Sequence, residues 1–239
     1  MFTNVIKSAL EKNKIDCRED LYGKLSIYLS LLKEWNQRMD LTAVTDDHET
    51  IDKHFIDSLS VLKCGLISHN SLLIDVGTGA GFPGLVLAMA RPDLHVTLLD
   101  SQQKRLNFIQ CVCDNTGTSN TQIFHLRAEE GARKPELREH FDYAVARAVA
   151  PLNVLCEYLL PFVKVSGYAL CWKGPALKDE MECGRRAARL LGGRLEMPFI
   201  CHLEGRDWEH TILPVQKIQK TDPIYPRKAG IPKAKPLGI

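Results

Sequence analysis

Apolar residues in the first quarter of the chain recur at helical spacing. In "LYGKLSIYLSLLKEW" five of them lie three or four positions apart: Leu21, Leu25, Tyr28, Leu32 and Trp35. After a polar turn at 40–47 the same spacing returns in a second set: Ile51, Phe55, Leu59 and Leu62. Steps of three and four place such residues on one face of a helix. The region up to about Cys64 is therefore predicted to be helical and to pack these faces into a core.

From residue 72 the pattern changes to short apolar runs that alternate with helical patterns. Strands are expected at five positions: 72–76, 95–99, 122–125, 142–146 and 168–172. Between the first two strands, Pro83 suits the first turn of a helix and Arg91-Pro92-Asp93 suits its end. In 102–115, a second helix places Leu106, Ile109 and Cys113 on one face. Strands that alternate with helices predict a parallel sheet covered on both sides.

The last part of this region contains two strand patterns with no helix between them, at 193–205 and 209–218, joined by the polar segment 204–208. Consecutive strands of this kind pair antiparallel and close one edge of a sheet. Methyltransferases that use S-adenosylmethionine (SAM) end their sheet with such a reversed pair, whereas dehydrogenase domains usually add a second mononucleotide-binding half. We expect a Rossmann-like α/β fold with a mostly parallel seven-stranded sheet, an antiparallel edge strand and N-terminal helices.

The final segment, "KTDPIYPRKAGIPKAKPLGI", has four prolines among its lysines and is expected to form no packed core. The predicted organisation is an N-terminal helical segment at 1–65 packed on a SAM-dependent methyltransferase domain at 66–219, followed by a basic tail at 220–239.

The 239 residues are 45 % hydrophobic and 25 % charged, as in an ordinary globular protein. No apolar run reaches the roughly 20 residues that span a bilayer, and the first residues do not resemble a signal peptide. We expect a cytoplasmic monomer without a membrane partner.

Eight cysteines are scattered along the chain without a Cys-x-x-Cys pair. They are expected to be small buried thiols, and no metal site is predicted.

The charge is distributed unevenly along the chain. From Gln216 onward six basic residues face one acidic residue, a net charge of +5, so the preceding part carries −3 of the total +2. A basic end on a weakly acidic body indicates an anionic partner, although a solvated terminus explains the same charge equally well.

The segment "LLIDVGTGAGFPGLVL" fits two glycine motifs that overlap. One is the loop of a SAM-dependent methyltransferase: Asp75, Gly77, Gly79 and Gly81. The other is the fingerprint of a dinucleotide-binding oxidoreductase: Gly79, Gly81, Gly84 and the downstream Asp100. A glycine turn that binds no ligand is the third interpretation. Both cofactors would sit at the carboxyl end of the first strand, where the strand order reverses.

The chemistry of the loop favours SAM. A diphosphate needs free backbone N–H groups at the start of a helix, and Pro83 removes one of them. Asp75 would repel a diphosphate but suits the ammonium end of SAM. Asp100 can accept hydrogen bonds from ribose hydroxyls in either cofactor, so it does not discriminate. The glycines allow close approach of either ligand.

Fewer sequence motifs indicate which atom accepts the methyl group. Enzymes that methylate exocyclic amino groups usually carry an Asn/Asp-Pro-Pro-Tyr/Phe loop after the fourth strand, where this chain has "ARAVAP", 146–151. Methylation of pyrimidine C5 requires a cysteine nucleophile, usually after a proline, and the chain has no Pro-Cys pair. Guanine N7 has a free electron pair and no proton to lose, so it needs neither device. The sequence is compatible with N7 as acceptor without establishing it.

Several segments together resemble one family: "YLSLLKEWNQRMDLTAVTDDHETIDKHFIDSL", "IDVGTGAGFPG", "RAEE", "ARAVAPL", "WKGP" and "YPRKAGIPKAKPL". In this order, over nearly the whole chain, they identify it as a member of the bacterial ribosomal RNA small-subunit methyltransferase G family, also called glucose-inhibited division protein B. The resemblance implies an enzyme that transfers a methyl group from SAM to N7 of a guanine in 16S ribosomal RNA of the small ribosomal subunit. An NAD-dependent oxidoreductase and a non-catalytic RNA-binding protein remain as alternatives.

The glycine motif, the basic tail and the resemblance together predict roles for individual residues; the resemblance supplies Gly77, Phe82, Ala128, Glu129 and Arg147. The expected cofactor-binding residues are Asp75, Gly77, Gly79, Gly81, Phe82, Asp100, Ala128, Glu129 and Arg147. Arg147 and Lys173 are candidates for positioning the acceptor, and no residue is assigned as general base. The expected RNA-binding residues are Lys173, Arg227, Lys228, Lys233 and Lys235. Plainer interpretations exist for three of them, with Phe82 as core, Glu129 as a first-turn acid of a helix and Arg147 as a solvated strand end. His54 is expected to be a hydrogen-bonded structural histidine.

Overall fold

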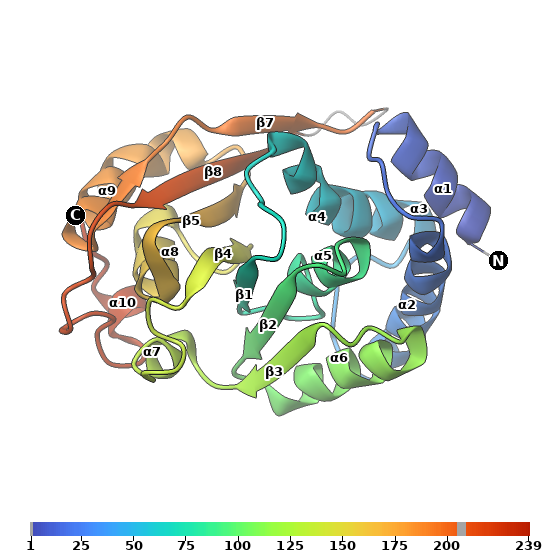
Figure 1. Ribbon diagram of the computed structural model, residues 1–239, viewed down its shortest axis with the longest axis horizontal. Helices are drawn as coiled ribbons and strands as arrows, with labels where there is room; N and C mark the ends of the chain where they lie inside the picture. Colours follow the sequence, from blue (N-terminus) through green and yellow to red (C-terminus); the bar gives the residue numbers. More distant parts are fainter. Residues whose placement is uncertain (1, 205–208) are drawn as a thin grey trace.

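The computed structural model describes residues 2–204 and 209–239, which form one twisted sheet with helices on both faces (Figure 1). Its strands are β1 (Leu72–Val76), β2 (His95–Asp100), β3 (Thr121–His125), β4 (Phe141–Arg147), β5 (Val163–Lys173), β6 (Gly193–Leu195), β7 (Phe199–His202) and β8 (Glu209–Lys217). They lie in the order β3-β2-β1-β4-β5-β8-β6, with β7 also paired to β8. The five predicted parallel strands are confirmed, and the order reverses beside β1, as the fold class requires.

The antiparallel end of the sheet differs in one detail from the expected seven strands. The residues predicted as one strand at 193–205 form two short strands, β6 and β7, which both pair antiparallel with β8. From Leu195 to Phe199 the chain advances four positions, while the paired residues on β8, Val215 and Ile212, are three apart. The additional residue interrupts the ladder as a β-bulge does, and Pro198 has no N–H to donate. Of the expected connection 204–208, residues 205–208 lie outside the described part.

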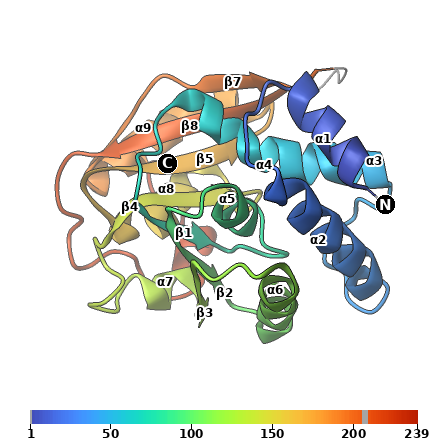
Figure 2. The same cartoon turned by 45° about the vertical axis from the view of Figure 1, so that its right-hand side comes forward.

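The N-terminal helices follow the apolar pattern. They are α1 (Thr3–Lys12), α2 (Asp20–Asn36), α3 (Asp47–Thr50), the π-helical turn η1 (Ile51–Ile56), α4 (Asp57–Leu59) and the 3₁₀ turn η2 (Ser60–Cys64). The predicted stripe on α2 is buried except for Trp35, which is half-buried. On the second pattern Leu62 is also only half-buried. Figure 2 shows these helices beside α5 and α6, which cover one face of the sheet.

Two apolar clusters lie on opposite faces of the sheet. The larger joins the N-terminal helices to β1, α5 (Gly84–Ala90) and α6 (Gln103–Thr116). The smaller lies under α8 (Leu152–Leu159), the 3₁₀ turn η3 (Leu160–Phe162) and α9 (Leu177–Leu190). Tyr28 of α2 donates a hydrogen bond to the Ala80 carbonyl in the glycine loop. The N-terminal helices therefore share a continuous core with the sheet and brace its glycine loop.

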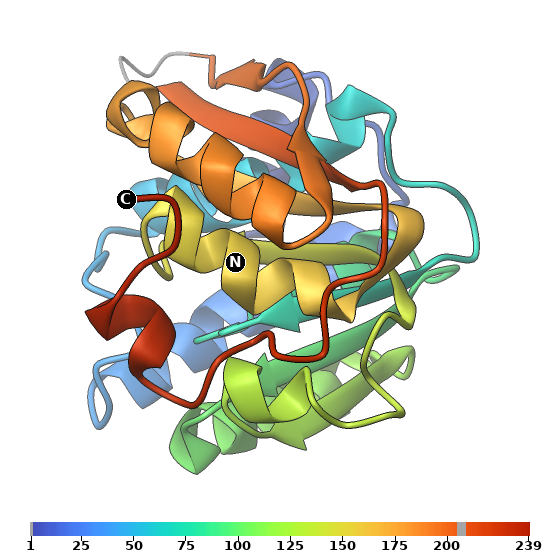
Figure 3. The same cartoon turned by 90° about the vertical axis from the view of Figure 1, so that its left-hand side faces the viewer.

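The basic tail docks on the body, which its composition did not predict. Residues 219–239, called the strap below, run from β8 across α8 and include α10 (Ile231–Ala234), close to α7 (Ala128–Gly131) (Figures 1 and 3). The strap has no core of its own, but Thr221, Pro226 and Pro232 are buried against the body. Guanidinium groups of Arg133 and Arg138 donate to strap carbonyl oxygens. The tail therefore forms no core of its own, as expected, but it is docked because side chains of the body satisfy its backbone.

All eight cysteines are free thiols, four of them buried and four half-buried. Across the described residues, no helix is both long and apolar enough to cross a membrane.

Candidate active site

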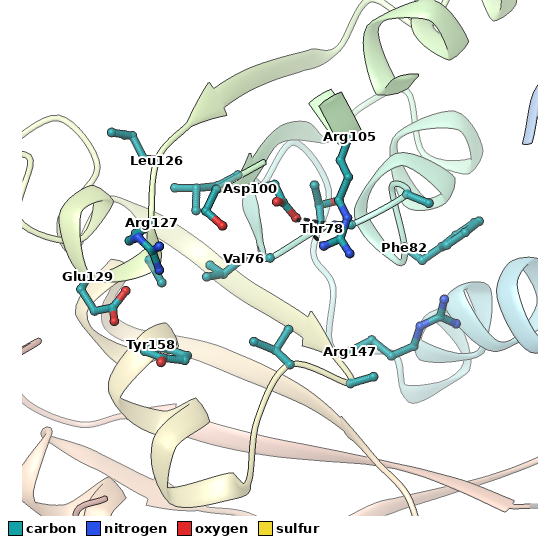
Figure 4. Close-up of a pocket in the computed structure, with 18 of the residues that line it drawn as sticks. Val76, Thr78, Phe82, Asp100, Arg105, Leu126, Arg127, Glu129, Arg147 and Tyr158 are labelled. Carbon is teal, nitrogen blue, oxygen red and sulfur yellow. Dashed lines mark hydrogen bonds and ion pairs between the residues drawn. The ribbon is translucent and has the colours of Figure 1, made fainter. Parts of the chain in front are cut away.

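A cleft of about 780 Å³ opens at the carboxyl ends of the parallel strands. Its walls come from the loop after β1, the ends of β2 and β4, the segment before α7 and the strap. Figure 4 shows Arg127, Glu129 and Tyr158 at one end of the cleft and Phe82 with Arg147 at the other. The position matches the topological switch point where ligands of open α/β sheets bind. Parts of the chain that are far apart in sequence thus meet at one site.

The glycine loop turns back over the end of β2. Gly77 and Gly79 both line the cleft with positive φ, +73° and +59°. The N–H groups of Gly77 and Thr78 donate to the Leu99 carbonyl, which holds the loop against β2. Gly81 does not line the cleft; a Cβ there would collide with the Tyr28 hydroxyl. Gly77 and Gly79 therefore fit ligand-contacting roles, whereas Gly81 permits close packing of α2 on the loop.

Asp75 lies behind the loop and does not line the cleft. Its fully buried carboxylate accepts hydrogen bonds from Thr78 Oγ1 at 2.7 Å and Gly84 N at 2.8 Å, both at Oδ2. Burial raises the pKa of Asp75 to about 6, against the lowering effect of these two donors. The expectation that Asp75 meets the cofactor directly is not met, because its hydrogen bonds tie the loop to the start of α5.

The start of α5 has few donors left for a phosphate group. Pro83 has no N–H, Gly84 N donates to Asp75, and Leu85 N donates to the Gly81 carbonyl at 2.9 Å. A diphosphate requires such N–H groups to be free. The loop therefore fits a ligand without phosphate groups.

Two carboxylates line the cleft. Asp100 ends β2, and its oxygens accept hydrogen bonds from Gly79 N at 2.9 Å and Gln102 N at 2.8 Å. Each oxygen has two lone-pair sites, so acceptor capacity remains for hydroxyl groups of a ligand. Glu129 lies in α7 and accepts from Gly230 N of the strap at 3.0 Å through Oε1. The predicted Ala128 and Glu129 are thus placed in the cleft wall, and Glu129 also joins the strap to it.

Arg147 connects the far end of the cleft to the N-terminal helices. Its Nη1 donates to Asp57 Oδ2 and to the Lys53 carbonyl, each at 2.7 Å. The guanidinium also lies 5.2 Å from the centre of the Phe82 ring. Asp57 is fully buried, and its other oxygen contacts His210 Nδ1 at 2.6 Å. Arg147 is therefore a fixed, paired cation in the cleft wall rather than a solvated strand end, and Phe82 belongs both to the core and to the cleft.

His54 lies on the same wall, stacked on Phe82 with ring centroids 4.6 Å apart. Its Nδ1 lies 3.2 Å from Arg147 Nη2, and its Nε2 lies 2.7 Å from Thr42 Oγ1. Burial, followed by the Arg147 charge, lowers the pKa of His54 to about 4. A neutral imidazole accepts from Arg147 at Nδ1 and donates to Thr42 from Nε2. The expected structural histidine is hydrogen-bonded as predicted, and it also faces the cleft.

Two residues expected to meet RNA are bound within the protein. Lys173 ends β5 but does not line the cleft; its ammonium pairs with Glu180 at 2.5 Å and its side chain is 9 % exposed. Arg227 pairs with the fully buried Glu157 at 2.6 Å. Both cations are neutralised by carboxylates, so direct phosphate contacts do not follow from this geometry. The other three expected residues, Lys228, Lys233 and Lys235, are exposed on the strap, and Lys233 borders the cleft.

Some cleft residues had no counterpart among the predicted sites. Thr42 and Leu41 come from the polar turn before α3, Tyr158 from α8, and Gly230 and Ala234 from the strap. The turn lies inside the segment that carried the family resemblance, which is the one signal that could have pointed to Thr42. Spacing alone could not place these residues, because their contacts join positions separated by most of the chain.

Comparison with known proteins assigns the chain to a family. The family model for GidB, rRNA small subunit methyltransferase G, matches residues 21–207. A Clostridium perfringens protein (strain 13 / Type A) of the same description is 44 % identical over 236 residues, 99 % of each chain. One from Alkaliphilus metalliredigens is 43 % identical over 233 residues, 98 % of each chain.

Solved structures share the fold at low identity. A 16S rRNA (adenine(1408)-N(1))-methyltransferase from Catenulisporales acidiphilia superposes with a TM-score of 0.51 and 15 % identity, covering 64 % of this chain and 90 % of its own. A putative transferase from Pyrococcus horikoshii gives a TM-score of 0.54 and 12 % identity, with 67 % and 62 % covered. These structural similarities support the Rossmann-like fold. The sequence identity to relatives that match over nearly their whole length, together with the family model, establishes the family. The chain belongs to the rRNA small subunit methyltransferase G family.

Proposed function

We propose that the protein transfers the methyl group of SAM to N7 of a guanine in 16S ribosomal RNA of the small subunit. The observation that carries the cofactor is the glycine loop, whose N–H groups at the start of α5 are committed within the protein. Such a loop disfavours the diphosphate of NAD and is compatible with SAM, which has no phosphate group. The RNA acceptor is supported by membership of a family whose members are named for it.

The residues of the cleft fit the ribose and adenine parts of SAM. Gly77 and Gly79 leave space beside the loop, and Asp100 retains acceptor capacity for ribose hydroxyls. Leu126, Ala128 and Tyr158 provide an apolar surface that suits an adenine ring. SAM supplies a methyl group already activated on a sulfonium, so the protein has mainly to position the acceptor.

The opposite end of the cleft suits an acceptor that needs no base. His54 is neutral, and both of its ring nitrogens are engaged, by Arg147 and Thr42. Asp57 is fully buried behind Arg147. Guanine N7 attacks through its free electron pair and loses no proton. The paired Arg147 and the stacked His54 and Phe82 form a rigid wall against which a base extruded from RNA can be positioned.

The test is transfer of labelled methyl from SAM to 30S subunits purified from a strain that lacks the enzyme. We expect label in 16S RNA, and mass spectrometry of nuclease fragments should identify N7-methylguanosine at one position. Subunits from the parent strain, already modified, serve as the control and should accept no label. Label at another atom of 16S RNA, or label in the 23S RNA of added 50S subunits and none in 16S RNA, contradicts the proposal.

A parallel fluorescence titration compares NADH with SAM on the same preparation. Binding of SAM without binding of NADH supports the methyltransferase interpretation. Tight binding of NADH alone would favour the oxidoreductase alternative. SAM binding without transfer to any ribosomal particle would leave a non-catalytic RNA-binding protein.

A further inference from the structure

The strap reaches the cleft that the proposed function assigns to SAM. Gly230, Lys233 and Ala234 are strap residues among those lining this cleft. Gly230 N donates to Glu129 Oε1 at 3.0 Å, across a separation of 101 residues. Glu129 is buried, and its carboxylate lies in the wall beside Tyr158 (Figure 4). The strap thus completes the wall at the end of the cleft that suits adenine.

One ion pair anchors the strap just before Gly230. Glu157 of α8 accepts three hydrogen bonds from Arg227 within 3.0 Å: from Nη2 at 2.6 Å, from the backbone N at 2.8 Å and from Nε at 2.9 Å. Glu157 is fully buried, so its charge depends on this guanidinium. The next residue on α8 is Tyr158, which lines the cleft. A single turn of helix therefore holds both the strap and the cleft wall.

Further contacts fix the strap on both sides of this pair. Upstream, Arg133 donates to the Ile224 carbonyl at 3.2 Å, and Arg138 donates to the Tyr225 carbonyl at 2.8 Å. Downstream, Asn153 of α8 donates to the Leu237 carbonyl at 2.9 Å. Arg227 lies between these two groups of contacts, and its side chain forms an ion pair with the fully buried carboxylate of Glu157. Removing it should loosen the part of the strap nearest the cleft, where the hydrogen bond from Gly230 to Glu129 remains, while the two ends of the strap stay attached.

We propose that the strap is a wall of the methyl-donor site and that Glu157 is a positioning residue that holds it closed through Arg227. This inference rests on the proposed function and extends it to residues with no assigned role. It also separates two kinds of strap cation. Arg227 acts inward on the donor site, whereas Lys228, Lys233 and Lys235 remain available to RNA. Because the docked strap forms part of the site, donor affinity scales with the fraction of molecules in which it is docked.

Calorimetric titration with S-adenosylhomocysteine tests the idea without RNA. If Arg227→Ala lowers the docked fraction to about one tenth, the dissociation constant rises about tenfold. Glu157→Gln keeps the shape and removes the charge, and should also weaken binding. Arg227→Lys keeps the charge without the two-pronged geometry and should fall between wild type and Arg227→Ala. Arg18→Ala removes an exposed arginine–aspartate pair at the start of α2, away from the strap, and is the matched control.

Hydrogen exchange at strap amides supplies a readout that does not depend on ligand. We expect faster exchange of residues 227–235 in Glu157→Gln than in wild type, with β1 and α5 unchanged. With 30S subunits, KM for SAM should rise while kcat at saturating SAM is retained. A purely structural defect would lower kcat and accelerate exchange throughout the sheet, and this outcome would overturn the proposal.

The remaining outcomes are also decisive. If wild type does not bind SAM or S-adenosylhomocysteine, the proposed function itself fails. If wild type binds S-adenosylhomocysteine and the dissociation constants of Arg227→Ala and Glu157→Gln stay within twofold of the wild-type value, the strap is not part of the donor site. Weaker binding with unchanged strap exchange would mean that Glu157 acts on the cleft directly, which would also overturn the inference.

Discussion

Charged side chains around the cleft are fixed by partners that the fold brings to them. Asp57 holds Arg147, Glu157 holds Arg227, and Asp75 holds the turn into α5. Motif spacing correctly brought Arg147 to the cleft but placed Asp75 on its surface and Arg227 on RNA. The difference arises because a motif specifies a position on the backbone, while burial and partners decide what the side chain does there.

The titration of Asp75 provides a prediction about stability and pH. Its pKa in the folded protein is about 6, above the ordinary value of 3.8. Between these values the folded protein retains a proton that the unfolded chain releases, so this contribution to stability is complete below the lower value and disappears as pH rises through the higher one. With Asp75→Asn as reference, the wild-type free energy of unfolding should fall by about 2–3 kcal/mol between about pH 4 and pH 7.

Urea unfolding of both proteins at several pH values measures this difference. Asparagine retains an oxygen for Thr78 and Gly84, so the two proteins should share their other titrations. A difference between them that stays constant with pH would show that burial does not raise the pKa of Asp75.

At the scale of elements, close contacts between helices and loops shape the cleft. α5 packs on β1 and β2 so closely that a Cβ on Gly84 would lie 2.6 Å from Asp75 Cβ and 2.7 Å from Leu98 Cδ2. α2 braces the loop through Tyr28. The π-helical turn η1 contains Lys53, whose carbonyl accepts from Arg147, and Asp57 follows it directly. Apolar spacing predicted these helices, but it could not distinguish a π-helical turn from an α-helix.

Two glycines in helices should respond oppositely to alanine. Gly84→Ala should destabilise the protein by about 1–3 kcal/mol, because the methyl group has no space between α5 and the sheet. Gly23→Ala, in α2, meets nothing within 4 Å and should stabilise by about 0.5–1 kcal/mol by restricting the unfolded chain. Denaturant unfolding measures both changes. Equal effects at the two sites would contradict the packing of α5.

At the scale of the whole molecule, the strap brings a basic segment to the mouth of the cleft. The strap lies on the side of the molecule opposite α1 (Figure 1), and its residues Lys228, Lys233 and Lys235 are exposed. These lysines place positive charge at the donor end of the cleft, so we expect the RNA backbone to contact this end while its base reaches the acceptor wall. The anionic partner stays a prediction, and the strap that would meet it is docked rather than solvated.

Salt dependence of RNA binding tests this placement. Changing Lys228, Lys233 and Lys235 to Ala should reduce the slope of log K against log salt by about 0.7–0.9 for each phosphate group that these lysines neutralise. The control changes three exposed lysines near the other end, Lys7, Lys12 and Lys14, which alters net charge equally. Equal reductions in both triple variants would mean that net charge, rather than the strap, drives binding.

The sequence by itself determined the five parallel strands, the antiparallel end of the sheet, the N-terminal helices and the position of the glycine loop. These features follow from periodicity and turn residues, which act over a few positions. Only the tertiary structure decided that β6 and β7 are separate, that Asp75 turns away from the cleft and that Arg227 is paired with Glu157. Such outcomes depend on tertiary contacts and burial, because a buried charged group is stable only beside a partner that local pattern does not reveal.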